Sequence, residues 1–164
     1  MPVVVSDAAP LHYLTLVGRE SILQRLYEVV VVPPAVLEEL SHPAAPQEVS
    51  NWAKQLPHWV RVVAPVLILT RHANLGRGER EALALTIELR ADLILLDDKA
   101  ARRIARNEHL KVKGTLGVIA DAASAKLLDF AATVRELQLT SMHLEKELVE
   151  QVLREQAQRS QDGA

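Results

Sequence analysis

The sequence predicts an α/β fold in which a central, mostly parallel sheet of about five strands is flanked by helices. Short runs rich in aliphatic residues recur at 3–5, 29–32, 60–63, 93–96 and, more weakly, 110–113. These runs are nearly continuous in apolar residues, which is typical of strands that are covered on both faces of a parallel sheet. Helical stretches separate the runs, so we expect a chain built of βαβ units.

Boundary residues place the helices between the strands. Pro33 and Pro34 close the second strand and fit the first turn of a helix at 35–40, where no amide donor is needed. The helix expected at 79–90 carries apolar residues on almost every side, which predicts burial on several sides. Further helices are predicted at 48–56, 99–107, 115–125, 130–137 and 144–155.

The end of the chain is expected to be a helix followed by a frayed tail. Leu144, Leu148, Val149 and Val152 form an apolar stripe on the helix, for which packing on the same domain is favoured over a partner surface. Residues 156–164 are polar and are predicted to fray.

Length and composition limit the chain to one globular domain. Its 164 residues suffice for one core, and we place the domain at 1–140, with the C-terminal helix and tail at 141–164. Hydrophobic residues make up 49% and charged residues 24%, which excludes a disordered or collagen-like protein. The absence of cysteine excludes disulfides, thiolate zinc sites and cysteine nucleophiles.

The apolar pattern and the net charge limit where in the cell the protein is expected and which kinds of partner it can bind. No stretch approaches the roughly 20 apolar residues that span a bilayer, and Asp7 comes too early for a signal peptide, so we expect a cytoplasmic protein without a membrane partner. The net charge of −2 argues against a protein that coats nucleic acid through its overall field. Nucleic-acid contact would have to come from a local segment.

The segment 99–113 is strongly basic. Arginine and lysine side chains there could position phosphates without reading sequence. A solvated basic helix face, or pairing of these cations with acids, is the simpler alternative. The basic residues are Lys99, Arg102, Arg103, Arg106, Lys111 and Lys113, against the single acid Glu108.

Acidic residues recur where the carboxyl ends of the strands and the nearby helix starts are expected. Ligands of open parallel sheets bind at this edge. Each acid alone has a simpler explanation, because aspartate caps helices and acids in a first turn favour the helix dipole. Together they form a constellation made of Asp7, Glu38, Glu39, Glu79, Glu81, Asp97 and Asp98.

Several carboxylates that converge on one pocket repel each other, so they must protonate or hold a cation. Oxygen ligands of this kind suit Mg²⁺ or Mn²⁺. One or two such ions can activate water and stabilise both oxygens of an in-line displacement at phosphorus. The sequence therefore indicates a metal-dependent hydrolase that acts on phosphodiesters.

Five segments, in this order, are similar to those of a known family. They are VVVSDAAPL at 3–11, VPPAVLEEL at 32–40, GRGEREAL at 76–83, LLDDKAAR at 95–102 and GTLG at 114–117. As a set the motifs are specific, although each is weak alone. Over residues 3–127 the chain resembles a PIN-domain nuclease, in particular the small prokaryotic toxin-type PIN-like branch of the DUF3368 type.

The resemblance implies a single PIN-like domain that binds Mg²⁺ or Mn²⁺ and acts as an endoribonuclease on single-stranded RNA. It also implies a toxin of a toxin–antitoxin pair, with an antitoxin protein as partner, and a homodimer. The implied catalytic residues are Asp7, Glu39, Glu79 and Asp97, and the implied metal ligands are these four together with Asp98.

Three choices among neighbouring acids stay open. The Glu-Leu ending of the second segment favours Glu39 over Glu38, and closeness to the helix start favours Glu79 over Glu81. Helical geometry does not decide the latter pair, because a two-residue step turns a side chain by about 200°. Either of Asp97 and Asp98 could be the ligand.

Two other functions compete with the nuclease. A catalytically silent binding or regulatory protein could keep the same fold, and metal binding without RNA cleavage would favour it. A phosphorylated receiver domain is also a parallel α/β fold with an acidic metal pocket. It needs paired acids after the first strand and an aspartate after the third, whereas this chain has Asp7 alone and then Ala64-Pro65.

Overall fold

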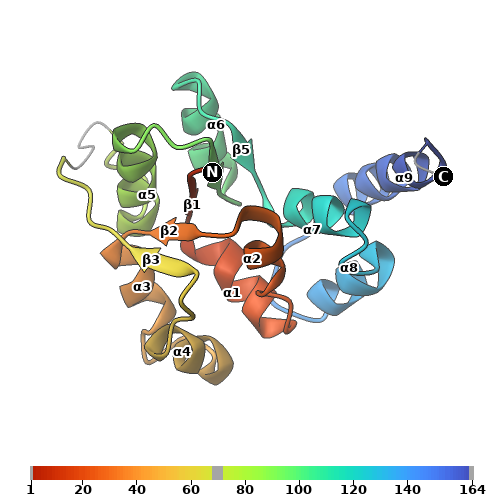
Figure 1. Cartoon of the computed structure of the whole chain (residues 1–164), viewed down its shortest axis with the longest axis horizontal. Coiled ribbons are helices and arrows are strands. Elements are labelled where there is room, and N and C mark those ends of the chain that lie inside the picture. Colours follow the sequence, from red (N-terminus) through yellow and green to blue (C-terminus); the bar gives the residue numbers. More distant parts are fainter. Residues whose placement is uncertain (1, 68–71, 163–164) are drawn as a thin grey trace.

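The structure is a computed structural model that describes residues 2–67 and 72–162. Its centre is a five-stranded, all-parallel sheet with the strand order β3-β2-β1-β4-β5 (Figure 1). The strands are β1 (Val4–Ser6), β2 (Val30–Val32), β3 (Val60–Val62), β4 (Leu93–Leu95) and β5 (Val112–Lys113). Each lies within a predicted apolar run or extends it by one residue, so the α/β class with a parallel sheet is confirmed.

Nine helices are present in the part of the chain that the structure describes. They are α1 (Ala8–Leu16), α2 (Ile22–Tyr27), α3 (Pro34–Leu40), α4 (Gln47–Lys54), α5 (Arg77–Glu88), α6 (Lys99–Asn107), α7 (Thr115–Ser124), α8 (Phe130–Gln138) and α9 (Lys146–Asp162). The last seven overlap the predicted helices. The apolar pattern predicts neither α1 nor α2, because AAPLHYLTL has no one-sided apolar stripe and α2 has only 6 residues.

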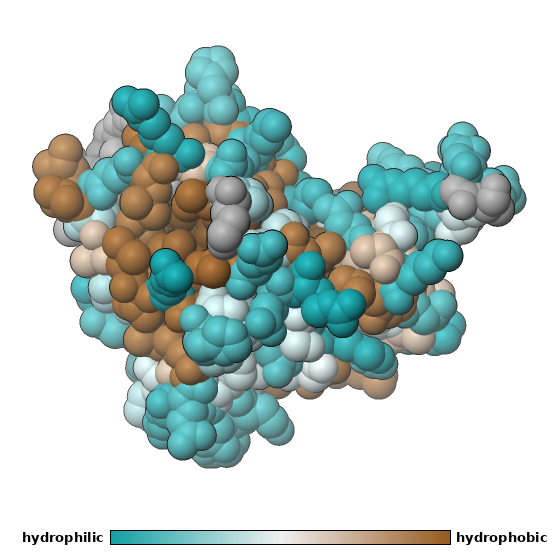
Figure 2. All heavy atoms as spheres, in the orientation of Figure 1, coloured by the Kyte–Doolittle hydropathy of each residue, from teal (hydrophilic) through white to brown (hydrophobic). Residues whose placement is uncertain are grey.

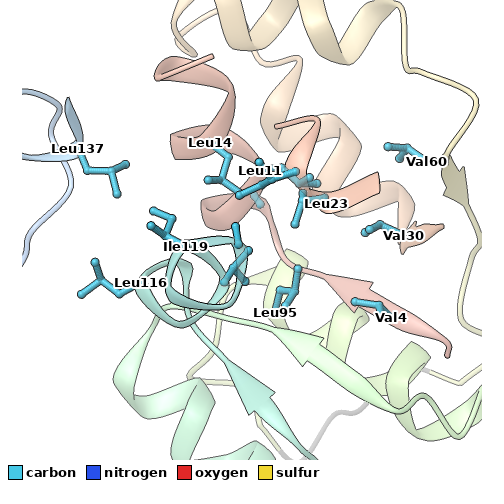
Figure 3. Close-up of a cluster of buried hydrophobic side chains, with 14 of the residues drawn as sticks. Val4, Leu11, Leu14, Leu23, Val30, Val60, Leu95, Leu116, Ile119 and Leu137 are labelled. Atoms are coloured by element: carbon cyan, nitrogen blue, oxygen red, sulfur yellow. The ribbon is translucent and has the colours of Figure 1, made fainter. Parts of the chain in front are cut away.

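The sheet separates two hydrophobic cores, since successive strand residues point to opposite faces. Val4 and Leu95 face the larger core, where Leu11 of α1 and Ile119 of α7 pack (Figure 3). Val5 faces the smaller core, which α5 and α6 cover. The domain is therefore a helix–sheet–helix sandwich. The central strands β1 and β2 are buried at every position, as their continuous apolar runs predict. The prediction of burial on both faces is wrong for the edge strand β3, where Arg61 and Val62 are exposed because none of the described helices covers them.

The buried part of α5 explains its unusual sequence. Residues 81–86 are buried at six consecutive positions, and the helix packs on β1, β4 and α3. Contact with the sheet on one side and with α3 on another requires apolar residues around most of the helix. The predicted burial on several sides is thus confirmed.

The C-terminal helix is longer than predicted, and the expectation of a frayed tail is wrong for residues 156–162. α9 continues to Asp162. Gln156 is buried, and its side-chain amide exchanges two hydrogen bonds with the Ser124 hydroxyl at 3.5 and 3.4 Å. Val149 is buried in the larger core, and Val152 packs against it. One face of α9 therefore packs on α7 and α8. The polar composition of residues 156–164, on which the prediction of a frayed tail rests, does not reveal this packing.

Hydrophobic side chains are exposed around one edge strand of the sheet. Figure 2 shows hydrophobic residues gathered over β2, β3 and α5, whereas the surface of α9 is largely hydrophilic. The large exposed hydrophobic residues of this region are Val62, Val63, Val66, Leu67, Ile87 and Leu89. Within the described residues, we find no helix with the length and apolar character that crossing a membrane requires.

Leu11→Ala is expected to lower the free energy of unfolding by about 3 kcal/mol. Leu11 is 0% exposed in the larger core, so its truncation leaves a cavity between α1 and the sheet. Urea unfolding measures the change. Leu139→Ala is the control, because Leu139 is 89% exposed and its loss should change stability by less than about 0.5 kcal/mol. Equal losses in the two variants would contradict this assignment of the core.

Candidate active site

Acidic residues follow two neighbouring parallel strands at the same edge of the sheet. Asp7 comes directly after β1, and Asp97 comes two residues after the end of β4. The backbone N–H of Asp7 donates to the carbonyl of Leu95 at 3.0 Å, which joins the two strand ends. This is the edge at which open parallel sheets bind ligands.

Helices α3 and α5 bring two further carboxylates to Asp7. Glu39 lies on α3, Glu79 lies in the first turn of α5, and the two helices pack on each other. Gly78 lies at the contact: a Cβ built there would be 3.5 Å from Oδ1 of Asp7 and 3.8 Å from Oε2 of Glu39. The start of α5 therefore borders the carboxylates, and a long side chain at position 78 would enter the space between them.

Asp7 has the most perturbed electrostatic environment of the site. Its side chain is 6% exposed, and burial, the largest effect, raises the pKa of Asp7 to about 7. The negative charges of Glu79, Glu39 and Asp97 raise this pKa further, while a hydrogen bond from the Ala8 N–H opposes the rise. The carboxyl group is therefore poised between its protonated and ionised forms near neutral pH.

The two glutamates share this environment to a lesser degree. Burial raises the pKa of Glu39. Burial also raises the pKa of Glu79, and the charges of Asp98 and Glu39 add to the rise, while a hydrogen bond from the Gly76 backbone opposes it. The charges of these acids thus act on one another, as the sequence predicts for acids that meet at one edge of the sheet.

Arg77 forms ion pairs with two of the four glutamates that are candidates for the metal site. Its Nη1 lies 3.0 Å from Oε2 of Glu38, and its Nε lies 3.0 Å from Oε2 of Glu81. Glu38 and Glu81 are therefore paired with a cation, whereas the charges of Glu39 and Glu79 act on Asp7. Sequence reasoning missed the part played by Arg77, although its spacing of four residues from Glu81 is a recognisable helix pair.

The adjacent aspartates Asp97 and Asp98 make different contacts. Asp97 accepts hydrogen bonds from the backbone N–H of Thr115 at 2.7 Å and from the Thr115 hydroxyl at 2.6 Å. Asp98 caps α6 by accepting a bond from the N–H of Ala101 at 2.9 Å. The fully buried Thr115 thus holds Asp97 at the start of α7, a contact that residues 18 positions apart do not reveal in the sequence.

The donor set fits a hard divalent cation, which prefers carboxylate oxygens. The buried Oδ1 of Asp7 has no hydrogen-bond partner in the described residues. A cation would satisfy this oxygen and offset the repulsion among the acids. Within residues 2–67 and 72–162, no three His, Asp or Glu side chains already lie close enough together to hold an ion.

Arg102 of α6 lies beside Asp97. A Cβ built on Gly114 would be 3.0 Å from both Nη1 of Arg102 and Oδ1 of Asp97, so glycine allows the two side chains to flank this position. Burial lowers the pKa of Arg102, the neighbouring charge of Arg106 lowers it further, and Asp97 raises it. The basic segment therefore reaches the edge of the acidic cluster.

Some cations of the basic segment are already paired. Lys113 contacts Asp121, and Lys99 contacts Glu145. The simpler alternative, in which basic residues pair with acids, is thus confirmed for these two lysines. In the described part of the chain, Arg102, Arg103 and Arg106 form no ion pair.

Comparison with known families gives a match over most of the chain. The family model DUF3368, described as a PIN domain, matches residues 3–158. The match includes most of α9, as well as all of the acidic residues described above. A search of curated proteins finds no match for the chain.

Proposed function

Because the chain belongs to the PIN domain family, whose members are generally nucleases, we propose that it is a metal-dependent endoribonuclease. In this proposal the protein hydrolyses phosphodiester bonds of single-stranded RNA with Mg²⁺ or Mn²⁺. The observation that carries the proposal is the Oδ1 atom of Asp7, which is buried and has no hydrogen-bond partner among the described residues. It lies at the carboxyl edge of the sheet, where the charges of other carboxylates act on it.

Asp7, Glu39, Glu79 and Asp97 would hold the metal, and Asp98 lies close enough for its charge to act on Glu79. A bound divalent cation would supply an activated water and neutralise charge on the phosphate during an in-line displacement. No covalent intermediate with the protein is needed, since these carboxylates serve as ligands and not as nucleophiles.

Residues of the chain itself would orient the ligands and the RNA. Thr115 holds both oxygens of Asp97, which keeps that carboxylate in one position at the edge of the site. Arg77 keeps Glu38 and Glu81 paired. Arg102 would contact a phosphate of the RNA, since its guanidinium lies beside Asp97 without an ion pair among the described residues.

The proposal extends to the biological role that the family resemblance implies. We propose that the protein works in the cytoplasm as the toxin of a toxin–antitoxin pair, binds an antitoxin protein and forms a homodimer. The exposed hydrophobic residues over β2, β3 and α5 (Figure 2) are a surface that such an association could cover.

Cleavage of labelled single-stranded RNA tests the function, with Mg²⁺, Mn²⁺ or EDTA in parallel. Glu39→Gln and Glu38→Gln are a matched pair of neighbouring substitutions, because the proposal assigns only Glu39 to the metal. The charge of Glu39 acts on Asp7, whereas Glu38 pairs with Arg77. We expect cleavage that needs metal and survives Glu38→Gln, with a loss of roughly 100-fold in Glu39→Gln. Cleavage in EDTA would contradict the proposal. Metal binding without any cleavage would favour the catalytically silent protein instead.

Thr115→Val is expected to lower the cleavage rate roughly tenfold and the free energy of unfolding by about 1 kcal/mol. Valine keeps the shape of the side chain but removes the hydroxyl that donates to Asp97. Initial rates and urea unfolding measure the two effects. Thr133→Val is the control, because Thr133 is a buried threonine whose hydroxyl donates to the carbonyl of Asp129, the residue before α8. Equal losses of activity in the two variants would contradict the positioning role of Thr115.

A further inference from the structure

A groove lies between α6, the start of α7 and the segment around the start of α9. Its volume is about 710 Å³, and Asp97 and Asp98 of the carboxylate cluster are among the residues that line it. A second hollow of about 630 Å³ lies along α6 and is lined by Arg103 and Arg106. Lys99, Arg102, Glu145 and Leu148 border both hollows, which makes them neighbouring parts of one surface.

The two walls of the groove differ in chemistry. The wall from the C-terminal part of the chain is mainly apolar and includes Met142, Leu144 and Leu148. The α6 side of the groove carries Lys99 and Arg102 together with Asp97 and Asp98. Lys99 is paired with Glu145, and the two aspartates accept hydrogen bonds from Thr115 and Ala101, whereas Arg102 forms no ion pair within the described residues. A ligand that matches the apolar wall and this unpaired cation combines an apolar surface with negative charge. An unpaired nucleotide has both, since the faces of its base are apolar and its phosphate is anionic.

We propose that this groove is a nucleotide-binding subsite that holds the unpaired RNA strand next to the scissile phosphodiester. The proposal rests on the proposed ribonuclease function, which places a phosphate at Asp97. A base would lie against Leu144 and Leu148, while Arg102 would contact the adjoining phosphate. The volume lies within the range of about 300 to 1,000 Å³ that is usual for small-molecule sites. A duplex keeps its bases stacked and paired, so the apolar wall selects single strands.

An ion pair crosses the surface at this point. Lys99 of α6 contacts Glu145, which precedes α9. Both side chains are exposed, by 83% and 48%, so the pair can exchange easily for a phosphate contact. Glu145 thus competes with RNA for Lys99, and its neutralisation should strengthen RNA binding.

Binding of a fluorescein-labelled single-stranded RNA of about ten nucleotides tests the subsite by fluorescence anisotropy in EDTA, where no cleavage is expected. Leu148→Glu places a negative charge where both hollows meet, and Leu148 is 40% exposed, so the fold should persist. Leu139→Glu is the matched control, because Leu139 is 89% exposed and lines neither hollow. We expect Leu148→Glu to weaken binding roughly tenfold or more and Leu139→Glu to change it less than about twofold.

Two further variants keep the test independent of Leu148. Arg103→Ala should weaken RNA binding a few fold and lower the slope of log affinity against log salt concentration by about one. Arg135→Ala on α8, which lies outside both hollows, should change neither quantity. Glu145→Gln should strengthen binding of the single strand. Equal affinities in Leu148→Glu and Leu139→Glu, or equal affinity for duplex and single strand in the wild type, would overturn the subsite.

Cleavage assays on the same variants separate this proposal from the nuclease itself. If the wild type cleaves RNA and Leu148→Glu leaves the KM unchanged, the nuclease function stands and the subsite is wrong. If no variant cleaves but Leu148→Glu still weakens RNA binding selectively, the subsite stands and the nuclease function fails. Both proposals together predict a higher KM in Leu148→Glu with little change in kcat.

Discussion

Replacing Asp7 by asparagine is expected to abolish RNA cleavage and, at the same time, to make the metal-free protein more stable above pH 7. In the wild type, the pKa of Asp7 is about 7 in the folded protein and 3.8 in an ordinary environment. The folded protein therefore keeps a proton that the unfolded chain has already lost between pH 4 and pH 7. The stability that this proton contributes is fully present below pH 4 and is lost as the pH rises to 7.

The size of this loss follows from the raised pKa. A shift from 3.8 to about 7 corresponds to about 4 kcal/mol at high pH. The asparagine side chain does not ionise, so the unfolding temperature of Asp7→Asn in EDTA should fall less in this window than that of the wild type. A smaller fall remains, because the pKa values of Glu39 and Glu79 are raised as well. Added Mg²⁺ should then raise the unfolding temperature of the wild type but not of the variant. A variant as pH-sensitive as the wild type would contradict the buried, mutually repelling carboxylates.

The second large effect is expected from Asp97→Asn, compared with Asp98→Asn. An asparagine at position 97 can still accept from the backbone N–H of Thr115, but its NH₂ group cannot accept the bond that the Thr115 hydroxyl donates, so this hydroxyl must turn and accept instead. Together with the loss of a ligand charge, this should lower the cleavage rate roughly 100-fold or more. An asparagine at position 98 still caps α6, because asparagine and aspartate are about equally good at that position.

Initial cleavage rates at saturating metal measure the difference between the two aspartates. Asp98→Asn should keep the activity within a few fold of the wild type, and urea unfolding should show that both proteins fold. A larger loss in Asp98→Asn than in Asp97→Asn would exchange the roles of the two residues and place the ligand on Asp98.

The sequence predicts those parts of the fold that depend on local patterns. The central strands β1 and β2 are visible because both of their faces are buried, which leaves continuous apolar runs. The edge strands β3 and β5 are less buried and are visible only through their aliphatic residues. α1 is not visible, because its residues pack on the sheet and on α4, α3 and α7 and so carry no single apolar stripe. The end of α9 is missed for the opposite reason, since Gln156 is polar and is buried by a tertiary contact with Ser124.

The candidate site also has features that the sequence predicts and features that depend on tertiary contacts. The topology of a parallel sheet is enough to predict that Asp7 and the pair Asp97 and Asp98 lie at the same edge of the sheet, since they follow strands. That β1 and β4 are neighbours is known only from the structure. The choice between neighbouring glutamates depends on Arg77, which reaches Glu38 on a different helix 39 residues away. The contact of Asp97 with Thr115 depends on how α7 starts beside β4, which no local pattern records.

Isothermal titration of the apoprotein with Mn²⁺ at pH 8 tests the central claim, that the carboxylates around Asp7 bind a divalent metal. The wild type should bind Mn²⁺ saturably, as should Glu48→Gln, which neutralises an exposed acid in the first turn of α4. Asp7→Asn should show no saturable binding in the same range. Absence of binding in the wild type, or equal binding in Asp7→Asn, would contradict a metal centre at this edge of the sheet.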